Sequence, residues 1–374
     1  MKNNEKKKNE AAAEGFIRQA GNYTSQNRHE EAAALYAKAA DISKTFEDTF
    51  DAATMFYDLN DFEKAEEYYR RCLNMKISDG NRLATLNNLG SVLTLATDYL
   101  PAEKVLMEAF NLGRKLSMQD DEESTEDIAQ TFDSLGTLYR DMGDSEKARK
   151  YYDEVINLYI ELNRTDPVKY SPKLAATLSN VGEMYNGTGR YEQAKEFHSV
   201  ALKIRKFLAD KDPETYRPKL AITLNNLANA HYLASNYDEA ARLYTQSYEI
   251  LEKLAARNPK AYNPDLMMTL GNLGNLYAAK REFKKAEKYY KECEKTARAL
   301  AANDPDTWNV RLGHTLVNMA IFYQDDYPQP MLSVNCAGEA VEVLRQCEKT
   351  AFVSKQLGYA IGVLKDWERR LENR

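Results

Sequence analysis

Few side chains in this sequence stand at spacings that support catalysis or metal binding. The four histidines are far apart, and none belongs to an HExxH motif or stands near a cysteine at ligand spacing: His29, His198, His231 and His314. The four cysteines include no CxxC pair: Cys72, Cys293, Cys336 and Cys347. The turn Gly187-Thr188-Gly189 lacks the Lys-Ser/Thr that completes a phosphate-binding loop. We therefore predict no enzymatic activity, no metal and no cofactor.

A recurrent asparagine is the residue that could bind a ligand. It stands two positions before a small residue in five of six copies of one motif, with Ser134 in the remaining copy: Asn88, Asn180, Asn226, Asn272 and Asn318. Asparagine is a mediocre helix former, and packing would favour an apolar residue, so we expect the position to require an amide. An amide offers a donor and an acceptor, which suits a peptide backbone. Further asparagines would enlarge the same polar face: Asn225, Asn229 and Asn275.

The motif itself is an internal repeat. LNNLG, ending at Gly90, recurs in related form with its last residue at Gly136, Gly182, Ala228, Gly274 and Ala320, and each step is 46 residues long. A second small residue follows twelve positions after the first, as Ala102 follows Gly90. Turn residues such as Gly143-Asp144 lie between the two. The pattern predicts two helices in close contact in every repeat.

This pattern resembles the tetratricopeptide repeat family over nearly the whole chain, although the usual period of that family is ~34 residues. The longer period is similar to the arrays of kinesin light chains. The additional residues include a Pro after Asp or Asn at Pro167, Pro213, Pro259 and Pro305, which marks the end of one helix and the start of the next. We expect the second helix of each repeat to be lengthened, with an exposed aromatic residue at the joint: Tyr170, Tyr216, Tyr262 and Trp308.

The resemblance implies an all-α solenoid, a right-handed superhelix of about eight helical hairpins with a C-terminal capping helix. We expect a disordered polar tail at residues 1–10, the repeat array at 11–345 with its 46-residue period from about residue 82, and the cap at 346–374. A terminal repeat is expected to differ from the others because it presents a polar outer face.

The resemblance also implies a function. In kinesin light chains and in the repeat domain of the O-linked N-acetylglucosamine transferase, asparagines at this position bind the backbone of an extended peptide, so a protein or peptide ligand is expected in a concave groove. Few basic residues flank the motif, which disfavours a C-terminal carboxylate as the ligand. Alternatively, the amides bridge neighbouring helices. Other functions compatible with the pattern are a regulatory protein that senses short peptides and a self-assembling structural array.

The charge balance limits the other partners. The 57 acidic and 51 basic residues are spread along the chain and give a net charge of −6, so no basic stripe for nucleic acid is present. No run approaches the ~20 apolar residues that span a membrane. The polar start lacks the apolar run of a secretory signal, and we expect a cytoplasmic protein that is a monomer or a weak homo-oligomer.

Overall fold

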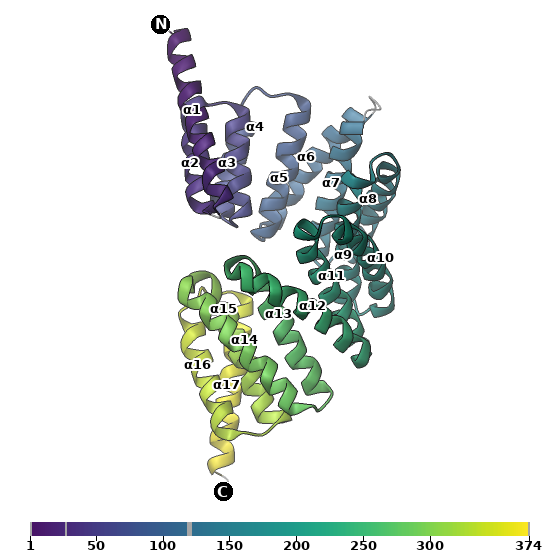
Figure 1. Ribbon diagram of the computed structural model, residues 1–374, viewed down its shortest axis with the longest axis vertical. Helices are drawn as coiled ribbons and strands as arrows, with labels where there is room; N and C mark the ends of the chain where they lie inside the picture. The colour runs from purple at the N-terminus through teal and green to yellow at the C-terminus, as the bar shows by residue number, and fades with distance from the viewer. Residues whose placement is uncertain (1, 27, 118–121, 373–374) are drawn as a thin grey trace. The chain divides into compact units, whose positions relative to one another are not determined.

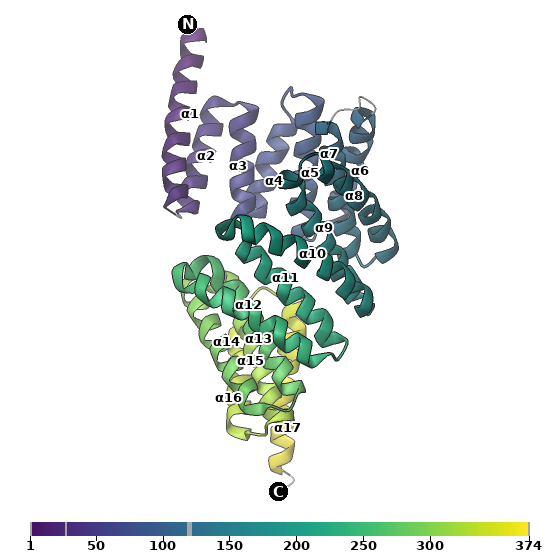
Figure 2. The ribbon, with the colours of Figure 1, turned by 45° about the vertical axis from the view of Figure 1, so that its right-hand side comes forward.

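The computed structural model describes residues 2–26, 28–117 and 122–372. Seventeen α-helices and one π-helical turn account for most of these residues, and no strand occurs in the described ranges (Figure 1 and Figure 2). Helices that follow one another pack as pairs, for example α5 with α6 and α13 with α14. The predicted all-α solenoid is confirmed.

The chain forms two compact units, residues 1–184 and 185–374. The helices of the first unit are α1 (Lys2–Ser25), α2 (His29–Ser43), α3 (Phe46–Asp58), α4 (Phe62–Leu73), α5 (Asp79–Leu95), α6 (Tyr99–Ser117), α7 (Glu122–Asp141), α8 (Ser145–Thr165) and most of α9 (Pro167–Gly187). Those of the second unit are α10 (Tyr191–Lys211), α11 (Pro213–Leu233), α12 (Tyr237–Arg257), α13 (Pro259–Ala279), α14 (Phe283–Asn303), α15 (Pro305–Ile321), η1 (Phe322–Asp326), α16 (Pro330–Arg345) and α17 (Ala351–Glu372).

Proline and a capping side chain set the helix boundaries, as the sequence indicates. Asp212 ends α10, its side chain accepts a hydrogen bond from the backbone N–H of Thr215, and Pro213 is the first residue of α11. Proline suits this place because the first helical N–H has no partner within the helix. The helices from α10 to α14 all have 21 residues. The additional residues of the long period therefore lengthen both helices of a repeat, not only the second.

The recurring small residues lie where the two helices of a repeat touch. A Cβ atom on Gly136 would stand 2.7 Å from the ring of Tyr152, and one on Gly274 would stand 2.6 Å from the ring of Tyr290. Both tyrosines are buried, and each lies four residues after the second small residue of its repeat. The small residues are therefore needed for close packing of helix against helix.

The two ends of the chain differ from the expected boundaries. Residues 2–10, expected to be a disordered tail, are the first turns of α1, in which Lys and Glu favour helix. The C-terminal helix α17 begins at Ala351 instead of residue 346 and packs against α15 and α16. None of the helices, within the described residues, is long and apolar enough to cross a membrane.

The core of the second unit contains a buried histidine. His198 in α10 takes the position that tyrosine holds at Tyr152 and Tyr244, and it is fully buried. Neither ring nitrogen has a hydrogen-bond partner among the described residues. Burial lowers the pKa of His198 from 6.5 to about 4. The folded state therefore favours the neutral ring over the charged one.

We expect this histidine to destabilise the fold in acid. The folded-state pKa of His198 lies below the unfolded value. The contribution of the neutral ring to the free energy of unfolding is therefore complete above pH 6.5 and is lost as the pH falls toward 4. Between pH 7.5 and 4.5 the parent should lose about 2 kcal/mol more unfolding free energy than His198→Tyr, as urea denaturation at the two pH values would measure. Parallel losses in the two proteins would mean that the His198 ring is hydrated in the folded state.

Candidate peptide-binding groove

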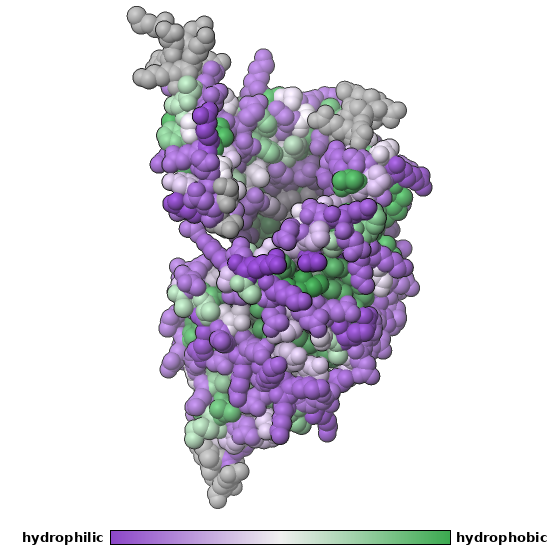
Figure 3. Space-filling model, in the orientation of Figure 1, coloured by the Kyte–Doolittle hydropathy of each residue, from purple (hydrophilic) through white to green (hydrophobic). Residues whose placement is uncertain are grey.

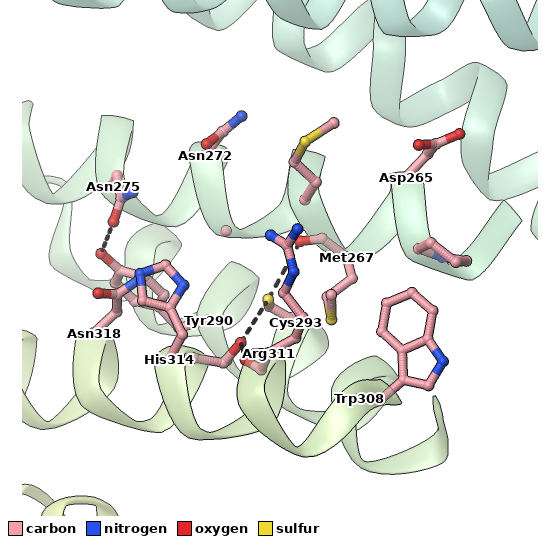
Figure 4. Close-up of a pocket in the computed structure, with 14 residues that line it drawn as sticks. Asp265, Met267, Asn272, Asn275, Tyr290, Cys293, Trp308, Arg311, His314 and Asn318 are labelled. Atoms are coloured by element: carbon pink, nitrogen blue, oxygen red, sulfur yellow. Dashed lines mark hydrogen bonds between the residues drawn. The ribbon is translucent and has the colours of Figure 1, made fainter. Parts of the chain in front are cut away.

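Two cavities meet between α13 and α15 in the second unit, and we call them together the α13–α15 groove. The first has a volume of about 240 Å³ and includes Asn272, Trp308 and Arg311 in its lining. The second has a volume of about 300 Å³ and lies toward the C-terminal ends of the two helices. Asn275, Tyr290 and Asn318 line both cavities. Figure 4 shows the first cavity, with Asn272 and Asn275 on α13 and Trp308, Arg311, His314 and Asn318 on α15.

Three of the predicted asparagines form the polar lining of this groove. The Asn272 amide nitrogen donates to Asn225 Oδ1 at 3.1 Å, and Asn275 Oδ1 accepts from the Tyr290 hydroxyl at 2.7 Å. The Asn318 amide nitrogen lies 3.4 Å from His314 Nε2. In each residue the other half of the amide has no hydrogen-bond partner in the part of the chain that the structure describes. All three side chains are half-buried, so these free groups face a restricted space.

Two predicted asparagines of the second unit stand outside the cavity lining. Asn226 and Asn229 are half-buried on α11 and do not line either cavity. Asn225 is 3% exposed, and its carbonyl is occupied by Asn272. The Asn225–Asn272 pair bridges two repeats, which is the alternative role that the sequence left open.

The remaining predicted asparagines lie in the first unit. Asn88 accepts a hydrogen bond from Gln130 Nε2 at 3.1 Å, and the Asn180 side chain donates to the carboxylate of Asp133. Both are half-buried. Each therefore links neighbouring repeats through at least one half of its amide.

Sequence reasoning missed the ionisable residues of the groove as ligand-binding candidates. Arg311 is exposed, and its guanidinium forms no ion pair or hydrogen bond with the described residues. Burial, followed by the charge of Arg311, lowers the pKa of His314, and its neutral ring can donate and accept. Asp265 is half-buried, and burial raises its pKa while Lys219 opposes the shift. A signal was available, because the 46-residue period places charged residues in successive repeats at Lys173, Lys219, Asp265 and Arg311.

The aromatic residues at the joints are not exposed contacts. Tyr170 is fully buried, and its hydroxyl donates to Glu126 at 3.0 Å. Tyr216, Tyr262 and Trp308 are half-buried, and Trp308 lines the first cavity. The expectation that these side chains are exposed is therefore wrong, because Tyr170 is buried and the other three are half-buried.

The fold and its repeats define a class of protein. Sequence profiles of the tetratricopeptide repeat match residues 50–76, 81–161, 127–207, 208–253 and 269–300. The chain belongs to the tetratricopeptide repeat family. Repeats of this kind generally form interaction or regulatory scaffolds without enzymatic activity.

Solved structures share this fold at low sequence identity. BtubC (BKLC) from P. vanneervenii is 20% identical with a TM-score of 0.51, over 66% of this chain and 91% of that one. A signal transduction ATPase with a tetratricopeptide repeat sensor, from Pyrococcus horikoshii, is 17% identical with a TM-score of 0.55, over 92% and 45%. A Rap protein complexed with Competence and Sporulation Factor is 12% identical with a TM-score of 0.56, over 96% of each chain. No curated protein matches the sequence.

Proposed function

We propose that the α13–α15 groove binds an extended segment of a partner protein through asparagine side chains. The observation that carries this proposal is that Asn272, Asn275 and Asn318 line the groove, and each keeps half of its amide free. The free groups are a carbonyl on Asn272, an NH₂ on Asn275 and a carbonyl on Asn318. An extended backbone presents N–H and C=O groups to both kinds of partner.

The bonds that these asparagines already make support the same role. Asn225 holds Asn272, and the Tyr290 hydroxyl holds Asn275, so both amides are oriented before a ligand arrives. A side chain that is already ordered loses less entropy on binding. The bridging role and the binding role are therefore compatible within one amide, because each half serves one of them.

A short free peptide is the second candidate ligand for this groove, which would make the protein a regulator. The Rap protein that matches 96% of this chain was solved with Competence and Sporulation Factor. The groove chemistry is the same in both cases, since both ligands offer an extended backbone. The two candidates differ in whether the natural ligand is an internal segment of a folded partner.

We expect Asn318→Ala to weaken binding with little change in stability. The probe is a dodecapeptide selected on the full chain from a displayed random library and then synthesised with a fluorescent label. The loss of one hydrogen bond to a ligand backbone should raise its Kd about threefold to tenfold in anisotropy titrations. The melting temperature should remain near that of the parent, because the contact of Asn318 with His314 is long, at 3.4 Å.

Asn229→Ala is the matched control. Asn229 is an equally half-buried asparagine of the same unit, but it lies outside both cavities, so its removal should leave the Kd unchanged. Asn272→Ala should behave differently from both, because it also leaves the buried Asn225 carbonyl without its partner and costs about 1–3 kcal/mol of stability. If Asn318→Ala and Asn229→Ala bind every selected peptide as tightly as the parent, the proposal is wrong.

A further inference from the structure

The second cavity of the α13–α15 groove has an unusual combination of side chains. Three aromatic rings line it, those of Tyr232, Tyr290 and Phe322, together with the aliphatic side chain of Ile321. Asp326 contributes the one carboxylate of this cavity among the described residues. Rings and a carboxylate that face a common space are the surroundings that a cation prefers.

Asp326 has no cationic partner in contact. Its carboxylate forms neither an ion pair nor a side-chain hydrogen bond within the described residues. Burial, followed by the neighbouring charge of Asp325, raises the pKa of the Asp326 carboxyl, and the more distant Arg281 only partly opposes this shift. A cation in the cavity would therefore meet the Asp326 carboxylate without competition from an ion pair within the protein.

Asp326 lies at this cavity because the backbone after α15 differs from that of the preceding repeats. In the two preceding repeats the first helix ends with a residue of positive φ, Ser235 at 61° and Arg281 at 59°. After α15 the chain continues instead as the π-helical turn η1, in which the N–H of Tyr327 donates to the Phe322 carbonyl at 2.9 Å. π-Helical turns are rare in proteins, and those that do occur are often found at functional sites. Asp326 also stands 46 residues after Lys280, so the charge at this position is reversed in this repeat.

We propose that this cavity receives a lysine or arginine side chain of the bound segment, an inference that rests on the proposed peptide-binding function of the groove. The cation would pair with Asp326 and lie against the ring of Tyr232, which is half-buried, whereas the rings of Tyr290 and Phe322 are buried beneath the cavity. The aliphatic stem of the lysine or arginine would pack on Ile321. The second cavity shares Asn275, Tyr290 and Asn318 with the first cavity. A peptide backbone bound to these asparagines would therefore run along the opening of the second cavity. This continuity favours a side chain over the ammonium group of a peptide terminus.

The test uses the full chain and the same displayed random dodecapeptide library. Selected peptides should carry Lys or Arg at one fixed position, and replacing that residue by Gln in the synthetic peptide should weaken binding about tenfold. Asp326→Asn keeps the shape of the side chain and removes its charge, and it should cause a loss of similar size. Asp325→Asn is the matched control, because Asp325 lies in the same turn but does not line the cavity.

The outcomes separate this inference from the function on which it rests. Peptides that need Asn318 but have no fixed cation, or that bind Asp326→Asn as tightly as the parent, would overturn the cation site and leave the groove function intact. Binding that is lost on acetylation of the peptide N-terminus and unaffected by the Lys→Gln change would show that the cavity takes a terminal ammonium instead. A selection in which no peptide depends on Asn318 would overturn both.

Discussion

Replacing Trp367 by Ala should lower the free energy of unfolding by about 3–5 kcal/mol, the usual range for removing a large buried aromatic side chain. Trp367 lies on α17 and is 8% exposed. It packs with Ala320, Ala337 and Val363. Its indole N–H donates to Ser333 Oγ at 2.9 Å, and the Ser333 hydroxyl donates in turn to the Ala320 carbonyl at 2.8 Å. The substitution therefore removes apolar contacts and also breaks a buried chain of hydrogen bonds.

Urea denaturation followed by circular dichroism measures this loss. Tyr359→Ala on the same helix is the matched control, because Tyr359 is 47% exposed and its loss should change stability by less than about 1 kcal/mol. We also expect Trp367→Ala to aggregate more readily, since a terminal helix covers the apolar face of the repeat before it. Equal stability of the two variants would show that α17 does not act as the cap of the array.

Gly274→Leu should have a comparable effect through overpacking. A Cβ atom at Gly274 would already stand 2.6–3.0 Å from ring atoms of Tyr290, and leucine adds three further carbon atoms there. Overpacking of a core usually costs about 1–3 kcal/mol, and we expect the upper end or more because a buried ring can be displaced only by disturbing the residues packed around it. Gly274→Ala should be milder, since Ala228 holds the corresponding position in the preceding repeat and packs in the same cluster as Tyr244.

The control for Gly274→Leu makes the same chemical change in open space. A Cβ atom at Gly362 on α17 would have no neighbour within 4 Å, so Gly362→Leu should be neutral or stabilising, as helix propensity favours leucine over glycine. Peptide binding should also fall in Gly274→Leu, because Tyr290 holds the Asn275 carbonyl and a displaced ring would release it. A variant that melts normally and binds normally would contradict the close packing at Gly274.

The surface of the protein seen in Figure 3 is mainly polar. The view in Figure 3 is dominated by hydrophilic residues, with hydrophobic ones in small patches. Some large apolar side chains are exposed: Leu100 at 76% and Met331 at 74% lie outside the α13–α15 groove, whereas Met268 at 39% lines its first cavity. The groove therefore offers a ligand both polar and apolar contacts.

The sequence by itself determined the helices and the contacts within each repeat. Small residues at a 46-residue spacing, and a Pro after Asp or Asn at each joint, act on their neighbours over a few residues, through helix capping and the close packing of two adjacent helices. Such local rules can be applied without knowing where distant residues lie. The repeat also singled out Asn272 and Asn318, which line the groove, but Asn226 at the same position of the preceding repeat does not line it.

Only the tertiary structure decided what each amide does. Asn225 and Asn226 are adjacent in sequence, yet Asn225 is buried and bonded to Asn272 from the next repeat, while Asn226 is half-buried. The second cavity of the groove likewise brings Tyr232, Tyr290 and Asp326 together from three repeats. These arrangements depend on how successive repeats stack and on a π-helical turn, and no propensity acting within a few residues can specify the distance between side chains 47 or more positions apart.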